Sequence, residues 1–365
     1  MSQPPEPQYP GTPPQPPPYP GGHAQPPPPP PYPTSPPLPQ PPHAPDDLDY
    51  QTGRGKRAYY KAHQRGADAT ALGQLALYLP GFLMSLLMVL LVTGILEAVV
   101  GLPYWIPTLA WIVSGALVFH RPAEDCFARY LLKLRRPMPQ EAARLQPVWQ
   151  EVTARAGVDG HRYELWIENS QDLNAYAAAG HIVGVTRFAL ERLPSAQLAA
   201  VLAHELGHHT GGHAWTSLLG YWYSLPGRVA WRVINWVVVF TVTITSYVSY
   251  LATAVLILVI GILTLATITV LYGLPLVLLA VPYLIAAVGR RAELKADEYA
   301  AVHGFAPKLA EVLHTMHGME LQTQHYAAAA GKPLADPGTL AKLLATHPDY
   351  PTRLLRLQPY LRAPR

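Results

Sequence analysis

The 365-residue sequence is poor in cysteine and in charge. Its one cysteine, Cys126, excludes an intramolecular disulfide framework and zinc ligation by paired cysteines. Asp, Glu, Lys and Arg make up only 14% of the chain, and the 57 residues of the segment 233–289 include none of them and no histidine. A helix in a soluble core keeps a polar face, so this segment favours membrane spans over a buried core. A transporter would need ionisable groups within its spans, so that class is disfavoured.

The formal net charge of +4 is unevenly distributed along the chain. Lysine and arginine gather beside the apolar segments instead of forming a recognition face. This distribution is typical of membrane orientation and not of nucleic-acid binding. The sequence therefore predicts the lipid bilayer as a partner and no nucleic acid.

Proline is concentrated at the start of the chain, where 23 of the 41 prolines precede Asp46. Such a stretch cannot bury a core, so residues 1–50 are expected to form a disordered tail outside the fold. The tail lacks the short apolar segment that a secretory signal peptide contains. Residues 16–19 and 29–32 both read Pro-Pro-Pro-Tyr and fit a partner that binds proline-rich motifs, but a plain tether is the favoured interpretation.

Four apolar segments are predicted to cross the membrane, two within residues 75–119 and two within residues 233–289, the latter turning near Gly261. Basic residues flank each pair and are absent from both turns. By the positive-inside rule, both hairpins enter and leave on the cytoplasmic side of the membrane. The remaining expected segments are a basic juxtamembrane segment at 51–74 and cytoplasmic segments at 120–232 and 290–365, which contain the motifs described next.

Residues 204–208 read His-Glu-Leu-Gly-His, the HExxH motif, in a stretch with helical character that begins at Ser195, a plausible N-cap. Residues four apart share a helix face, so His204 and His208 can direct their imidazoles at one Zn²⁺. Glu205 lies one step round the helix and can reach the reacting water. Chance supplies this motif in roughly 2% of scrambled sequences, so the rest of the chain has to support it.

A catalytic zinc needs a third protein ligand and an open position. A histidine ten residues after the first is excluded because that position is Ala214. Glu293 is the better candidate, and Asp297 shares its helix face and can orient a ligand histidine. Alone, these two carboxylates would be an ordinary solvated face. His209 and His213 do not share the ligand face, so they are expected to be exposed or to support the ligands.

The order of these motifs resembles that of the HtpX-type membrane zinc metallopeptidases, which are gluzincins related to the CAAX prenyl proteases. The likeness runs from about Asp172 to the C-terminus. The matching motifs are Asn174-Ala175-Tyr176-Ala177, Ile182–Thr186, the HExxH motif, Glu293 with Ala296 and Asp297, and Thr346-His347-Pro348 with Arg353. The resemblance implies a mainly α-helical membrane protein, with a small β-sheet in a gluzincin-like catalytic domain and about four transmembrane helices.

The resemblance also implies one Zn²⁺ per chain, bound by His204, His208 and Glu293, with Glu205 as the general base. Further roles follow from the same likeness. His347 would help to stabilise the oxyanion, and Arg353 would brace the site together with Asp297. Asn174, Ala175, Tyr176 and Ala177 would form an edge strand that an extended substrate joins through main-chain hydrogen bonds.

These residues predict a zinc-dependent endopeptidase that cleaves polypeptides at the cytoplasmic face. The resemblance adds membrane proteins as substrates, a role in membrane-protein quality control and a bacterial inner membrane as the location. The alternative is a membrane-anchored scaffold or adaptor with a structural or vestigial zinc site. A structural site needs no general base and normally closes its fourth position with protein, so the presence of Glu205 argues against that alternative.

Overall fold

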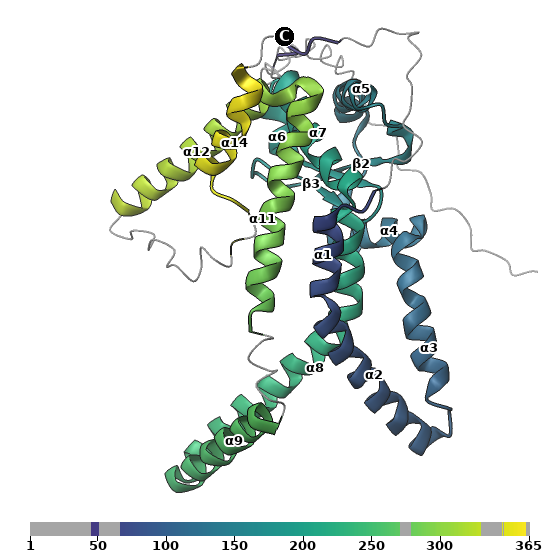
Figure 1. Cartoon of the computed structure of the whole chain (residues 1–365), viewed down its shortest axis with the longest axis vertical. Helices are drawn as coiled ribbons and strands as arrows, with labels where there is room; N and C mark the ends of the chain where they lie inside the picture. Colours follow the sequence, from purple (N-terminus) through teal and green to yellow (C-terminus); the bar gives the residue numbers. More distant parts are fainter. Residues whose placement is uncertain (1–44, 51–65, 271–278, 330–344, 346, 363–365) are drawn as a thin grey trace, which may run out of the picture. The chain divides into compact units, whose positions relative to one another are not determined.

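Helices dominate the part of the chain that the structure describes, and one small sheet accompanies them (Figure 1). All of the described residues belong to one unit, which begins at His43. The predicted fold class, mainly α with a small sheet, is confirmed. The computed structural model describes residues 45–50, 66–270, 279–329, 345 and 347–362, so both Pro-Pro-Pro-Tyr segments and most of the expected tail and basic juxtamembrane segment lie outside the described residues.

The first apolar pair is unequal in length. Helices α1 (Ala69–Leu77) and α2 (Leu79–Val100) together form an apolar run of 32 residues. Gly101 ends α2 with φ at 75°, a left-handed conformation that glycine adopts without steric cost. The returning segment, α3 (Trp105–Ser114) and the 3-10 helix η1 (Gly115–Phe119), is apolar but shorter.

The second apolar pair differs from the prediction in its turn. Helix α8 (His213–Val248) has 36 residues and α9 (Tyr250–Val270) has 21, and the two meet at Ser249, whose backbone is extended. The turn predicted near Gly261 is wrong, because Gly261 lies inside α9. Glycine is common within membrane helices and does not by itself mark a turn. The start of α8 also lies well before residue 233, where the span was expected to begin.

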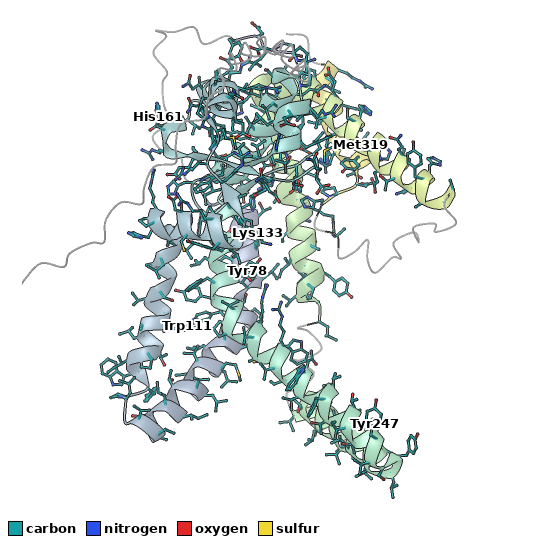
Figure 2. The ribbon with its side chains drawn as sticks, turned by 180° about the vertical axis from the view of Figure 1, so that it is seen from behind. Tyr78, Trp111, Lys133, His161, Tyr247 and Met319 are labelled. Carbon is teal, nitrogen blue, oxygen red and sulfur yellow. The ribbon has the colours of Figure 1, made fainter. Side chains whose placement is uncertain are left out.

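Three helical runs in the described part of the chain are long and apolar enough to cross a membrane, namely α1 with α2, α8, and α9. None of the residues of α9 is buried, and Tyr247 near the end of α8 is 84% exposed (Figure 2). A contiguous apolar surface of this kind is a liability in water. A lipid environment accounts for it, as the composition predicts.

The sheet has four strands in the order β1-β2-β4-β3. Strand β2 (Glu164–Glu168) pairs antiparallel with β1 (Leu134–Arg135) and parallel with β4 (Ile182–Thr186). Strand β3 (Ala175–Ala178) pairs antiparallel with β4 and forms one edge of the sheet. The segment expected to be an edge strand is therefore one, although Asn174 precedes it.

The main helices of the remaining part are α5 (Pro139–Ala156), α7 (Ser195–Gly211), α11 (Val281–Ala300), α12 (Ala306–Ala329) and α14 (Tyr350–Arg362). Helix α7 lies at their centre, with Leu198, Leu202 and Leu206 fully buried in the core that α5 and α12 share. These leucines recur every four residues, so they form one apolar face of the helix. The shorter elements are α4 (Arg121–Cys126), the π-helix η2 (Phe127–Leu131), the 3-10 helix η3 (Gly160–Arg162), α6 (Arg187–Arg192) and the π-helix η4 (Ala301–Phe305).

Two expectations about the N-terminal side of the fold need correction. Ser195 is the first residue of α7 and not its N-cap, which is Pro194 and makes no side-chain hydrogen bond. Residues 45–50 were expected to belong to the tail outside the fold, but they contact the start of α7: the backbone N–H of Ala196 donates to Oδ1 of Asp47 at 2.9 Å. The sequence pattern does not show this because the two partners are 149 residues apart.

Candidate metal centre

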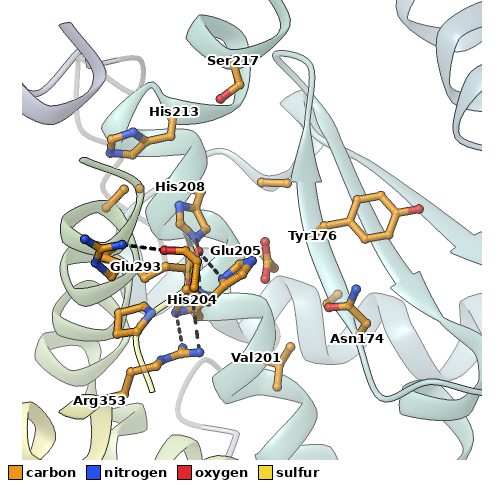
Figure 3. Close-up of a pocket in the computed structure, with 18 of the residues that line it drawn as sticks. Asn174, Tyr176, Val201, His204, Glu205, His208, His213, Ser217, Glu293 and Arg353 are labelled. Atoms are coloured by element: carbon orange, nitrogen blue, oxygen red, sulfur yellow. Dashed lines mark hydrogen bonds and ion pairs between the residues drawn. The ribbon is translucent and has the colours of Figure 1, made fainter. Parts of the chain in front are cut away.

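His204, His208 and Glu293 direct polar atoms at one another (Figure 3). The Nε2 atoms of the two histidines are 3.3 Å apart, and they lie 3.5 and 3.4 Å from the nearest carboxylate oxygens of Glu293. In a tetrahedral zinc site with bonds of about 2.0–2.1 Å, two ligand atoms are roughly 3.3–3.4 Å apart. The donor set brought together by α7 and α11 therefore fits one Zn²⁺.

The close crossing of α7 and α11 depends on small residues. A Cβ atom placed on Gly207 would lie 3.0 Å from the Cα atom of Ala296 and 3.1 Å from the Cβ atom of Tyr299. Gly207 stands between the two candidate histidine ligands, so the missing side chain lets α11 approach the motif itself. The close approach of the two helices at Gly207 brings the carboxylate of Glu293 within reach of both imidazoles.

Asp297 lies one turn after Glu293 and is almost fully buried. Its Oδ1 atom is 2.8 Å from Nδ1 of His204. Arg353 of α14 donates from Nε to Oδ2 at 2.8 Å and from Nη2 to Oδ1 at 2.6 Å. A carboxylate beside Nδ1 favours the tautomer with its proton on that atom, which leaves Nε2 free to bind a metal.

The site contains ionised carboxylates whose negative charge has to be balanced by a cation. Burial lowers the pKa of His204, but its hydrogen bonds to Asp297 and Glu293 outweigh burial and raise that pKa to about 10. Burial raises the pKa of Glu293, yet the histidines around it hold its pKa far below the ordinary value. Buried carboxylates are stable only when positive charge compensates them, and a divalent metal bound by neutral imidazoles would supply that charge in place of protonated His204.

Glu205 is buried beside the candidate ligands and accepts a hydrogen bond from the backbone N–H of Ala177. Burial raises the pKa of its carboxyl group, which suits a general base that works near neutral pH.

Strand β3 has an open edge towards the site. The backbone N–H of Thr186 donates to the carbonyl of Asn174, so hydrogen-bonded and non-hydrogen-bonded residues alternate along β3 from that point. Ala175 and Ala177 therefore turn their main-chain groups away from β4, at the open edge of the sheet.

His347 lies beside the metal site although its side chain is 72% exposed. Its Nδ1 atom is 3.2 Å from Oε1 of Glu293, and this hydrogen bond raises the pKa of His347. The described structure thus brings His347 to the ligands, on the segment just before α14. This position leaves its ring free to meet a bound substrate.

A cavity of about 1880 Å³ contains the site. Asn174 and Tyr176 line it from the side of the sheet, and Met316 and Tyr350 line it from α12 and α14. Figure 3 shows the labelled Asn174 and Tyr176 across the cavity from the candidate ligands. The cavity is therefore wide enough for an extended peptide between β3 and the metal site.

His209 and His213 are both buried, and neither joins the ligand cluster. His209 lies with Nε2 2.9 Å from the carbonyl oxygen of Ile182 and so attaches α7 to the sheet. His213 lines the cavity, with its ring 6.0 Å from that of His208. Helical spacing cannot place His213 because Gly212 has φ at 86° and redirects the chain into a new helix.

The comparisons with known proteins agree with this arrangement. A family model described as peptidase family M48 matches residues 139–360, which is more than half of the chain. The match extends from α5 into α14 and includes every residue of the site described above. A search of curated proteins returned no match.

Proposed function

The chain belongs to peptidase family M48, and from that premise we propose that it is a zinc-dependent endopeptidase that cleaves membrane proteins at the cytoplasmic face of a membrane. Membership makes the chain a metallopeptidase that hydrolyses polypeptides. The observation that carries the zinc assignment is the spacing of 3.3 to 3.5 Å among the polar atoms of His204, His208 and Glu293.

In this mechanism the chain's own residues prepare and move a proton. Zn²⁺, when bound by the three ligands, supplies Lewis acidity to the reacting water and to the scissile carbonyl. Glu205 takes the proton from that water and later delivers it to the leaving amine. Burial keeps the pKa of Glu205 above its ordinary value, so its protonated form is accessible for the second transfer.

Substrate binding is assigned to the edge of the sheet. Ala175 offers its outward main-chain groups, and Ala177 offers its carbonyl, since the N–H of Ala177 already donates to Glu205. An extended peptide can pair with these groups as an added strand. Recognition through the main chain requires no particular side chain, so broad sequence tolerance is expected. Asn174 and Tyr176 lie beside the same cavity and contact the substrate on its flank.

His347 and Arg353 have different parts in this proposal. His347 is exposed and lies 3.2 Å from Glu293, so it can approach the oxyanion that forms on the substrate carbonyl. Arg353 is buried and holds Asp297, so it braces the ligand His204 without touching the substrate. The two residues are thus expected to differ in their effects on turnover and on metal affinity.

The cytoplasmic placement rests on the basic residues beside the apolar helices. Those that follow the first pair are Arg121, Arg129, Lys133, Arg135 and Arg136. The far turns, Gly101–Tyr104 and Ser249, carry no Lys or Arg. A bacterial inner membrane, lipid contacts and a quality-control role complete the proposal, and the proline-rich tail is assigned to a partner that binds such motifs or to a tether.

Degradation of an unfolded model polypeptide by the detergent-purified protein tests the function. We expect Glu205→Gln to lower turnover by about 10²-fold or more while one zinc per chain is retained. The matched control is Glu191→Gln, the same change at an exposed residue of α6, which should cleave like the wild type. Removal of the metal should abolish cleavage, and added Zn²⁺ should restore it.

Two results would contradict the proposal. Cleavage by Glu205→Gln at the wild-type rate would remove Glu205 as the base. Stoichiometric zinc without cleavage in any sample would favour the second candidate function, a membrane-anchored scaffold with a structural zinc. Among the residues that the structure describes, the cluster offers three ligands and has the carboxylate of Glu205 beside it, which is the observation against that second candidate.

A further inference from the structure

Residues 45–50, named here the strap, bind the N-terminus of the helix that carries the metal ligands. The backbone N–H of Ser195 donates to the carbonyl of Pro45 at 3.1 Å, and that of Ala196 donates to the carboxylate of Asp47 at 2.9 Å. The first N–H groups of a helix have no partner within the helix and need an outside acceptor. Two such groups of α7 therefore depend on the strap.

Helix α7 has no capping group of its own at this end. Its N-cap residue is Pro194, whose side chain cannot accept a hydrogen bond, and its first turn contains no acidic residue. The positive end of a helix dipole is stabilised by a nearby carboxylate. Asp47 supplies that carboxylate from a remote part of the chain, in place of the local Ser, Thr, Asn or Asp that usually caps a helix.

The strap is attached to the helices on both sides of α7 as well. Leu48 packs against the buried core, and the guanidinium of Arg155 on α5 donates to the carbonyl of Asp49. Nζ of Lys308 on α12 lies 3.9 Å from Oδ2 of Asp47. Apolar, main-chain and ionic contacts thus hold this six-residue segment on three helices of the catalytic part.

The contacts at Asp47 lie on the same helix as the candidate ligands. Helix α7 continues without interruption from Ser195 through His204 and His208 to Gly211. A helix end without caps opens first, because its terminal hydrogen bonds are the least supported. Loss of the cap therefore loosens the helix turn by turn towards His204.

We propose that the strap clamps α7 in the position that the metal site requires, with Asp47 as a positioning residue for the ligands on that helix. The inference rests on the proposed function, since it concerns the geometry of that site. When Asp47 no longer accepts from Ala196, metal retention and cleavage both fall.

The test uses full-length protein in detergent and three variants of the strap. Asp47→Ala removes the acceptor, and Asp47→Asn keeps an oxygen that can accept from Ala196. Asp49→Ala removes the same charge from a residue whose main-chain carbonyl accepts from Arg155. The measurements are hydrogen exchange of the first amides of α7, the rate of zinc loss to a chelator, and turnover.

Asp47→Ala is expected to raise exchange at the start of α7 by about fivefold, the effect of losing one typical helix cap, and to speed zinc loss. Asp47→Asn should restore most of the wild-type behaviour, and Asp49→Ala should match the wild type. Wild-type exchange and zinc loss in Asp47→Ala would overturn the proposal. Equal effects of Asp47→Ala and Asp49→Ala would also overturn it, because charge and not capping would then be responsible.

The exchange and zinc measurements do not depend on peptide cleavage. Repeating them in the Glu205→Gln background therefore separates the two proposals. A protein that cleaves nothing even with Glu205 intact, but still responds at Asp47, would contradict the peptidase assignment alone. A protein that cleaves with Glu205 intact, but shows no response at Asp47, would contradict the strap alone.

Discussion

The Nδ1 atom of His204 lies 2.8 Å from Oδ1 of Asp297, and both oxygens of this carboxylate accept from Arg353. The chain His204–Asp297–Arg353 is buried and joins α7, α11 and α14. It fixes the ring orientation and the tautomer of His204, a candidate ligand. It should therefore affect the affinity for the metal more than the rate of the chemical step.

Asp297→Asn is expected to weaken zinc binding by about 10–100-fold, because the amide keeps the shape of the side chain but loses the charge that polarises His204. The measurement is competition for zinc with a chelator of known affinity. Glu298→Gln is the matched control, since Glu298 is the next residue of α11 but accepts only from the hydroxyl of Tyr360. Unchanged zinc affinity in Asp297→Asn would exclude the role in orienting His204.

Gly207→Ala is expected to push α7 and α11 apart, because the added Cβ would meet the backbone of Ala296 at 3.0 Å. Overpacking of this kind costs about 1–3 kcal/mol and should lower both the unfolding temperature and the zinc affinity. Gly318→Ala in α12 is the control, since nothing lies within 4 Å of its added Cβ. A stable, zinc-replete Gly207→Ala protein would show that the crossing of these helices is not limited by Gly207.

Gly184→Ala is expected to impair substrate binding and leave zinc binding intact. Gly184 pairs with Tyr176, and a Cβ there would lie 2.7 Å from the ring of Tyr176, so that ring must move. A loss of about 1–3 kcal/mol in an interaction raises KM by roughly 5- to 160-fold if the edge strand binds the peptide. Steady-state kinetics with a peptide substrate checks this, and an unchanged KM would argue against binding at the β3 edge.

The sequence allowed the main parts of the site to be predicted because they follow helical spacing. The spacing of four predicts that His204 and His208 share a face, and the structure brings Glu293 to both. The apolar runs and the helix that begins at Ser195 were also foreseen, since composition over long windows decides them. The roles of these residues as ligands and base stay predictions until metal and turnover are measured.

Three features were beyond the sequence, one because it depends on a contact between remote segments and two because the local backbone conformation has no clear sequence signal. The cap of α7 comes from Asp47, which lies in a segment that composition assigns to the tail. The turn at Ser249 carries no glycine or proline signal, whereas Gly261 does and lies inside a helix. The burial of His213 follows from the left-handed Gly212, whose φ a spacing argument does not include.

The candidate ligands stand on opposite sides of the α8–α9 hairpin in the sequence. A ribosome therefore releases His204, Glu205 and His208 first and Glu293 only after both hydrophobic helices have been made. On the proposed ligand set, a nascent chain that stops in α9 carries a base and two ligands but no third one. The hairpin thus delays activation, and an unfinished chain cannot cut the proteins that surround it during its own insertion.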